Sequence, residues 1–96
     1  MGTFHSNLGA LHGITVVVHG VDDVVYVGRC HEADDRRVIL LDVDQHRAGE
    51  GGLSHREYLA RAAKWSVFKR HDHLILPAEQ VERIVPLGQL ADEMAR

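Results

Sequence analysis

The stretch from residue 14 to residue 44 most constrains what this chain can fold into, because it predicts three consecutive β-strands. Its first run, Ile-Thr-Val-Val-Val, is β-branched throughout, and such side chains suit a pleated surface covered on both sides. Short turns rich in glycine and aspartate separate the runs. The predicted strands cover residues 14–18, 24–32 and 37–44. A three-stranded antiparallel meander twists strongly, so further strands are expected to close the sheet.

The rest of the chain supplies elements that fit this expectation. Ser54 and Glu57 form a capping box that begins a predicted helix from His55 to about Val67. Pro77 marks a tight turn between two further strands. We therefore predict one domain, divided into a lead-in helix or arm (1–13), the meander (14–44), a flexible glycine-rich loop (45–53), a helix (54–67), two final strands (71–87) and a tail (88–96) that forms either a helix of about two turns or a frayed end.

Part of the meander resembles the first motif of the Sm-like proteins. That motif is an aromatic residue, any residue and a glycine, here Tyr26-Val27-Gly28, then an aspartate, here Asp34, then a hydrophobic strand at residues 38–41. The resemblance implies a mostly β fold: a small, strongly bent, five-stranded antiparallel barrel of the Sm-like or SH3-like kind, preceded by a short helix. The helix before the fourth strand is then an insertion. Gly28 inside a strand predicts a bulge or sharp bend.

The same resemblance implies a partner and a site. Sm-like proteins assemble into rings and often bind single-stranded RNA, with an Asp and an Asn near the second turn and a basic residue and Gly before the last strand. Asp34 and Asp35 match the Asp. The Asn position falls near Val38 and the basic-Gly pair near Leu76-Pro77, so these two elements are missing from this chain.

A cluster of basic and aromatic residues provides a second candidate for RNA contacts. Such a cluster holds single strands by phosphate attraction and base stacking. The alternative interpretation is a solvated helix end with cations near its C-terminus. For Trp65, the leading interpretation is an anchor that packs the helix onto the sheet, and the alternative is an interface or stacking residue. The predicted RNA-binding residues are Asp34, Asp35, Trp65, Lys69, Arg70 and His71.

Composition bounds these hypotheses. The formal net charge of −3 argues against nonspecific nucleic-acid binding and leaves a structural or protein-interaction scaffold as the alternative function. Cys30 is the single cysteine, so the chain has no internal disulfide and suits the reducing cytoplasm. The sequence shows neither a signal-peptide pattern nor an apolar run of transmembrane length. We expect a cytoplasmic protein with no membrane partner.

Eight histidines raise the hypothesis of a metal site. His71 and His73 share one face of a strand, and Asp42, Asp44 and His46 repeat that spacing. The sequence contains no HExxH or CxxC signature, and surface or interface histidines that titrate near neutral pH are the alternative. We therefore predict no metal and no cofactor.

An enzymatic function has weaker support in the sequence than RNA binding or a metal site. Cys30 and His31 are neighbours on a strand and point to opposite faces, and Ser54, beside His55, already serves as a helix cap. The sequence therefore predicts a protein that is not an enzyme. The resemblance implies an Sm-like module that forms a homo-oligomeric ring through its edge strands and binds single-stranded RNA, with the structural or protein-interaction scaffold as the alternative.

Overall fold

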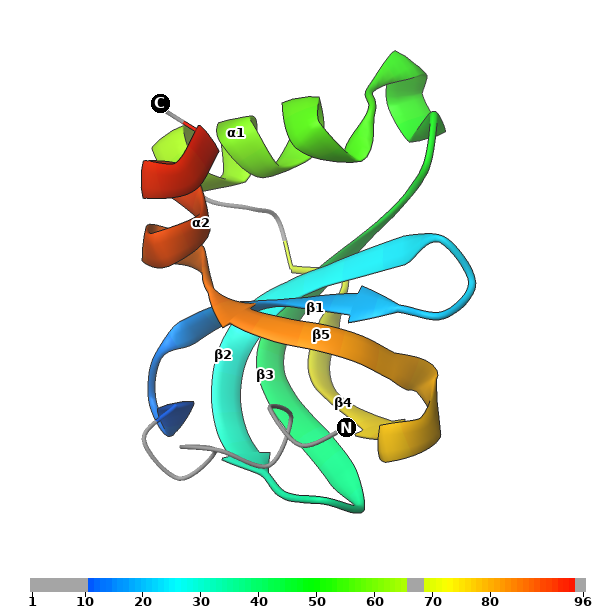
Figure 1. Ribbon diagram of the computed structural model, residues 1–96, viewed down its shortest axis with the longest axis vertical. Helices are drawn as coiled ribbons and strands as arrows, with labels where there is room; N and C mark the ends of the chain where they lie inside the picture. Colours follow the sequence, from blue (N-terminus) through cyan, green and yellow to red (C-terminus); the bar gives the residue numbers. More distant parts are fainter. Residues whose placement is uncertain (1–10, 66–68, 95–96) are drawn as a thin grey trace.

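The computed structural model describes residues 11–65 and 69–94, which form one antiparallel sheet and two helices (Figure 1). The strands are arranged β4-β3-β2-β1-β5, so β4 and β5 lie at the two edges. This arrangement confirms the predicted mostly β fold of five antiparallel strands. The elements in chain order are β1 (Thr15–Gly20), β2 (Val24–Ala33), β3 (Arg37–Arg47), the 3-10 helix η3 (Glu50–Gly52), α1 (His55–Trp65), β4 (His71–Pro77), the 3-10 helix η4 (Ala78–Gln80), β5 (Val81–Pro86) and α2 (Leu87–Met94).

A bulge bends the two longest strands, β2 and β3. Val27 pairs with Asp44 and Arg29 with Leu41, so Gly28 alone faces two residues of β3. A Cβ atom added at Gly28 would lie 3.1 Å from the carbonyl oxygen of Leu41, closer than most side chains tolerate. The bend predicted at Gly28 is therefore confirmed, and it has a steric reason for glycine.

The sheet is covered on both faces by apolar side chains. The first cluster contains Val16, Val18, Cys30, Val38, Leu40, Val43 and Leu76. The second contains Val17, Val25, Val27, Leu59, Ala62, Val85 and Leu90, and thus includes residues of both helices. Figure 1 shows α1 and α2 together at one end of the molecule. Neighbouring valines of β1 enter different clusters, which explains why the strand is apolar at each of residues 16–18.

Helix α1 packs through a leucine and an alanine rather than through its tryptophan. Leu59 and Ala62 are the buried residues of α1, whereas Trp65 is 72% exposed. The leading interpretation of Trp65 as an anchor is therefore wrong, because Leu59 and Ala62 fill the face of α1 that packs against the sheet. The interface or stacking interpretation stays open, and the Nζ atom of Lys64 lies 5.1 Å from the centre of the Trp65 ring.

Two boundaries differ from the sequence prediction. Residues 45–47 belong to β3 rather than to the glycine-rich loop, because they pair with Val24, Val25 and Tyr26 of β2. Strand β5 ends at Pro86 rather than at Leu87, and residues 87–94 form the helix α2, which is one of the two forms predicted for the tail and which buries Leu90. The predicted lead-in helix falls mainly on residues 1–10, and the predicted end of α1 on residues 66–67; both lie outside the described residues.

None of the helices within residues 11–65 and 69–94 is long and apolar enough to cross a membrane.

Candidate functional site

The predicted RNA-binding residues occupy two separate places. Asp34 and Asp35 lie in the β2–β3 turn, next to the point where Arg37 of β3 pairs with Pro77 of β4. Residues 69–71 lie at the other end of β4, where His71 pairs with Val43. The part of β3 between Arg37 and Val43 separates the two places, and it is roughly 20 Å long at the usual rise per residue. The structure therefore does not bring the predicted set together within one chain.

The Asp34 carboxylate organises its own turn. Its Oδ1 atom accepts hydrogen bonds from the backbone N–H groups of Arg36, at 2.8 Å, and Arg37, at 3.0 Å. These bonds hold the pKa of Asp34 below its usual value, with the Arg36 bond the larger cause. The backbone N–H of Ala78 then donates to the carbonyl of Arg36 at 2.8 Å. The β2–β3 turn and the turn between β4 and β5 are therefore adjacent.

The cations of the second group are already engaged by carboxylates. Lys69 Nζ lies 2.8 Å from Oδ1 of Asp72 and 3.5 Å from Oδ1 of Asp42. These contacts raise the pKa of Lys69, with the Asp72 hydrogen bond as the largest cause. An RNA phosphate at this position would have to compete with two carboxylates for one ammonium group.

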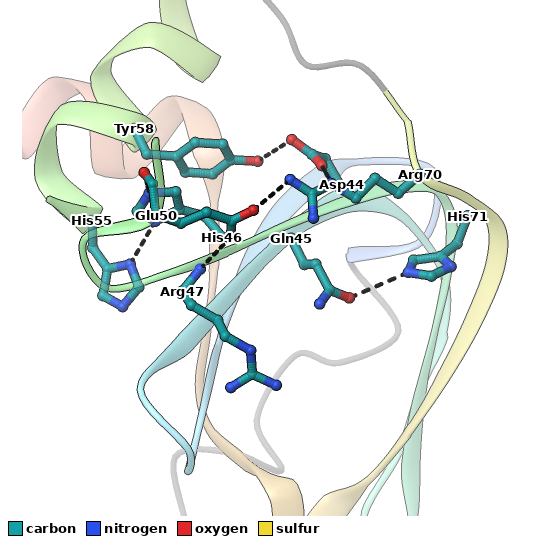
Figure 2. Close-up of polar contacts among 9 residues, drawn as sticks. All are labelled: Asp44, Gln45, His46, Arg47, Glu50, His55, Tyr58, Arg70 and His71. Carbon is teal, nitrogen blue, oxygen red and sulfur yellow. Dashed lines mark hydrogen bonds and ion pairs between the residues drawn. The ribbon is translucent and has the colours of Figure 1, made fainter. Parts of the chain in front are cut away.

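Arg70 belongs to a cluster that the sequence did not predict, and Figure 2 shows how its side chains meet. Arg70 Nε lies 3.0 Å from Oδ1 of Asp44, and its Nη2 lies 2.7 Å from Oε2 of Glu50. Tyr58 donates its hydroxyl hydrogen to Oδ2 of Asp44 at 2.7 Å, and the backbone N–H of Arg47 donates to Oε1 of Glu50 at 3.0 Å. We call these five residues the Asp44 network. The network joins β3, η3 and α1 to the segment entering β4.

The contacts of the Asp44 network shift the pKa values of Tyr58 and Glu50 in opposite directions. Burial, followed by the hydrogen bond to Asp44, raises the pKa of Tyr58 far above its usual value, so Tyr58 keeps its proton and acts as donor. The N–H of Arg47 and then the Arg70 guanidinium lower the pKa of Glu50. The network thus keeps Tyr58 neutral and Glu50 ionised around neutral pH. This arrangement suits structural fastening better than proton transfer.

A second group of imidazoles lies beside the network. His46 is only 3% exposed, and its ring stacks on that of Tyr58 with centroids 4.5 Å apart and an interplanar angle of 10°. Its Nδ1 atom lies 3.0 Å from Nδ1 of His55, at the start of α1. The Nε2 atom of His55 lies 3.0 Å from the carbonyl oxygen of Asp23, in the β1–β2 turn. The only sequence signal for this group was the alternation of Asp44 and His46 on β3.

The metal hypothesis is not supported by these positions. His71 faces Gln45, with Nε2 and Oε1 3.2 Å apart, while Asp42 contacts Arg29 and Lys69. Asp44 is held by the network described above. Across residues 11–65 and 69–94, no group of three or more His, Cys, Asp or Glu side chains is placed to hold a metal ion.

Two pockets lie near these groups. One, of about 230 Å³, adjoins the β1–β2 turn and is lined by residues that include His19, Asp23, His55 and Glu82. The other, of about 280 Å³, lies between the helices and is lined by Ala60, Ala63, Lys64, Ala91 and Met94. The first is polar and the second is mainly apolar.

The comparisons with known proteins place this geometry in a fold family. The chain aligns with the Sm protein of Pyrococcus abyssii, whose structure was solved in complex with a uridine heptamer, at a TM-score of 0.59 and 20% identity, covering 82% of this chain and 90% of that one. It also aligns with a novel Sm-like archaeal protein from Pyrobaculum aerophilum, at a TM-score of 0.57 and 17% identity, covering 86% of this chain and 50% of that one.

A third structure has a different biological setting. A chain from the NatC complex bound to CoA aligns at a TM-score of 0.58 and 17% identity, covering 91% of this chain and 92% of that one. No family model and no curated protein matches the sequence. The identities are low, so the structural agreement concerns the fold. The strand order, the bend in the β2–β3 pair and these alignments together show that the chain has the Sm-like fold.

Proposed function

We propose that this chain is a non-catalytic Sm-like module that self-assembles through its edge strands, in a ring, and binds single-stranded RNA. The observation that carries the proposal is the contact between the β2–β3 and β4–β5 turns, in which Ala78 donates to Arg36. Asp34 and Asp35, in the β2–β3 turn, therefore lie beside the turn before the last strand, and the Sm-like resemblance assigns RNA contacts to both of these turns. The Pyrococcus abyssii protein with the same fold was solved with a uridine heptamer, which supports RNA as the ligand class.

Self-assembly is supported by the edges of the sheet. Within the described residues, β4 pairs only with β3 and β5 pairs only with β1, so each has one side available. Unpaired strand edges favour pairing with another chain, and a head-to-tail arrangement of β4 with β5 of the next subunit would close as a ring. Ile75 on β4 is 47% exposed, which provides apolar surface at this edge.

The proposed RNA contacts divide according to the two places that the residues occupy. Asp34 shapes the turn and Asp35 is exposed beside it, so these two belong to the base-contacting end. Trp65, Lys69, Arg70 and His71 belong to a second area near α1, where an exposed indole favours stacking. Because Lys69 and Arg70 are ion-paired, we expect this second area to add modestly to affinity.

A protein-interaction scaffold is the second candidate function. The chain of the NatC complex has the same fold over almost its whole length and belongs to an assembly of proteins. The net charge of −3 and the ion pairs that occupy Lys69 and Arg70 also favour this alternative. Cys30, buried on β2, fits a reducing compartment such as the cytoplasm for either function.

Assembly is tested by mass in solution, measured by light scattering behind a sizing column at two ionic strengths. We expect a discrete homo-oligomer for the wild type and for Ile14→Lys, which changes an isoleucine that is 41% exposed outside the edge strands. Ile75→Lys should dissociate the assembly. A wild-type monomer of 10.7 kDa would contradict the ring.

RNA binding is tested separately with a fluorescent uridine oligonucleotide. We expect binding that weakens with added salt, because phosphate contacts release counterions. Asp35→Ala and Lys69→Ala should each weaken it, whereas Arg83→Ala, which removes the same charge as Lys69→Ala from β5, should not. An oligomer without any RNA binding would favour the scaffold.

A further inference from the structure

The start of α1 and the β1–β2 turn are joined by a chain of contacts that runs through two imidazole rings. His46 Nε2 lies 3.0 Å from the carbonyl oxygen of Glu50, and His46 Nδ1 lies 3.0 Å from His55 Nδ1. On the other side, His55 Nε2 lies 3.0 Å from the carbonyl oxygen of Asp23 and 3.3 Å from its Oδ1. We call His46 and His55 the histidine pair. All four of its ring nitrogens are therefore at hydrogen-bonding distance from a partner.

Counting hydrogens shows what charge this arrangement needs. The carbonyl of Glu50 only accepts, so His46 Nε2 must carry a hydrogen, and the same holds for His55 Nε2 facing Asp23. The contact between the two Nδ1 atoms needs one further hydrogen, on either ring. Three hydrogens are required, but two neutral imidazoles supply two. The histidine pair is complete only when it holds one extra proton and a single positive charge.

The surroundings suit one extra proton on this pair. The Asp23 carboxylate lies 3.3 Å from His55 Nε2, and Glu50 in η3 and Asp44 in β3 carry further negative charge around the pair. The cation of Arg70 is already engaged by Glu50 and Asp44. Tyr58 of α1 is neutral and stacks on His46. The backbone of Arg47 donates to Glu50, and Glu82 of β5 lines the same pocket as His55.

The neighbouring imidazole of β1 does not compete for this proton. His19 and His46 both pair with Val25, so they lie in one row across the strands. Burial is the largest cause that lowers the pKa of His19, followed by the charges of Arg83 and His55. Its Nε2 is buried without a partner among the described residues.

We propose that His46 and His55 share one proton that clamps the N-terminal end of α1 to the β1–β2 turn, so that this contact opens when pH moves in either direction. Loss of the shared proton turns the Nδ1 contact, or one of the outer contacts, into two facing lone pairs. Uptake of another proton places two N–H groups face to face. In both cases His55 moves, because its side chain is 24% exposed whereas His46 is 3% exposed.

The proposal is independent of RNA binding and assembly, and it is tested by NMR of the histidine rings in the intact protein. We expect the pair to take up its two protons in two steps separated by more than about one pH unit, as coupled groups do. The exposed His73 serves as internal control. In His55→Gln, His46 should titrate in one step.

Backbone exchange gives the structural readout. Between the two steps, amides at residues 54–58 should exchange about five-fold more slowly than on either side, which is the effect of one hydrogen bond. Asp23→Asn should reduce this protection, whereas His73→Gln should leave it unchanged. Independent single-step titration of His46 and His55 would overturn the proposal. Stoichiometric zinc uptake that is lost in His55→Gln would also overturn it, because the rings would then hold a metal instead of a proton.

Discussion

The hydroxyl oxygen of Tyr58 lies 2.7 Å from Oδ2 of Asp44, and this bond fastens the inserted helix to the third strand. Asp44 is 8% exposed, and its other oxygen contacts Arg70 at 3.0 Å. Both oxygens of a nearly buried carboxylate therefore have a donor. Groups of this kind are costly to leave without a partner, so the network sets where α1 sits on the sheet.

Tyr58→Phe should destabilise the fold by about 1.5–3 kcal/mol, the usual contribution of a hydrogen bond to a charged group. The ring keeps its stacking on His46, so the loss comes from the hydroxyl and from the less satisfied Asp44. Urea unfolding followed by circular dichroism measures the free energy of unfolding.

Tyr26→Phe provides the matched control, because Tyr26 packs against the other core cluster, away from α1. We expect Tyr26→Phe to change the free energy of unfolding by less than about 0.5 kcal/mol. Equal losses in the two variants would show that the Asp44 contact is not what stabilises Tyr58.

The acid stability of the protein should depend on Glu50. Its pKa is lowered in the folded chain, so its stabilising effect is present above the unfolded pKa, about 4.3, and is lost as pH falls through the folded pKa. Glu50→Gln should therefore be less stable than the wild type at pH 7, and the difference should shrink as pH falls below about 4.

Denaturant midpoints of the two proteins at pH 7 and pH 3 measure this effect, with Glu79→Gln as control on the exposed surface of η4. A difference between wild type and Glu50→Gln that persists unchanged at pH 3 would mean that Glu50 acts by packing rather than by charge.

Much of the fold was predictable because it depends on local patterns. The valine runs and the polar turns between them gave the strands, and Gly28 gave the bend. The capping box gave the start of α1, where Ser54 Oγ accepts from the N–H of Glu57 at 3.1 Å. Trp65 was mistaken because helical periodicity was taken to put it on the same face as Leu59 and Ala62, whereas these two residues are buried and Trp65 is 72% exposed.

The site was less predictable because it depends on distant pairings. Arg70 meets Asp44 and Glu50 only because residue 70 lies beside the end of β3, where its N–H donates to the carbonyl of Val43 at 2.8 Å. Asp34 and Asp35 lie at the opposite end of β3 from Arg70. The spacing of these residues in the sequence does not show that the strand separates them. The register of β3 on β4, which fixes both, is a tertiary property.

The capping box is expected to contribute measurably to stability. Ser54→Ala removes the hydroxyl that accepts from Glu57, while the Glu57 carboxylate still accepts from the N–H of residue 54. We expect a loss of about 0.5–2 kcal/mol in the free energy of unfolding, measured in urea. Ser54→Asp should restore most of it, since aspartate caps helices as well as serine does. A loss that Ser54→Asp does not recover would assign the effect to something other than capping.

Glycine-to-alanine substitutions at two positions should have opposite effects. At Gly28 the added Cβ would lie 3.1 Å from both the Leu41 carbonyl oxygen and Cγ2 of Val43, so the β2–β3 pair must shift. Overpacking of this kind costs about 1–3 kcal/mol. At Gly88, near the start of α2, an added Cβ would meet nothing within 4 Å, and alanine favours helix by about 0.5–1 kcal/mol. Thermal and urea unfolding should therefore show Gly28→Ala less stable and Gly88→Ala more stable than the wild type. A neutral Gly28→Ala would mean that the bend in the barrel tolerates a side chain at this position.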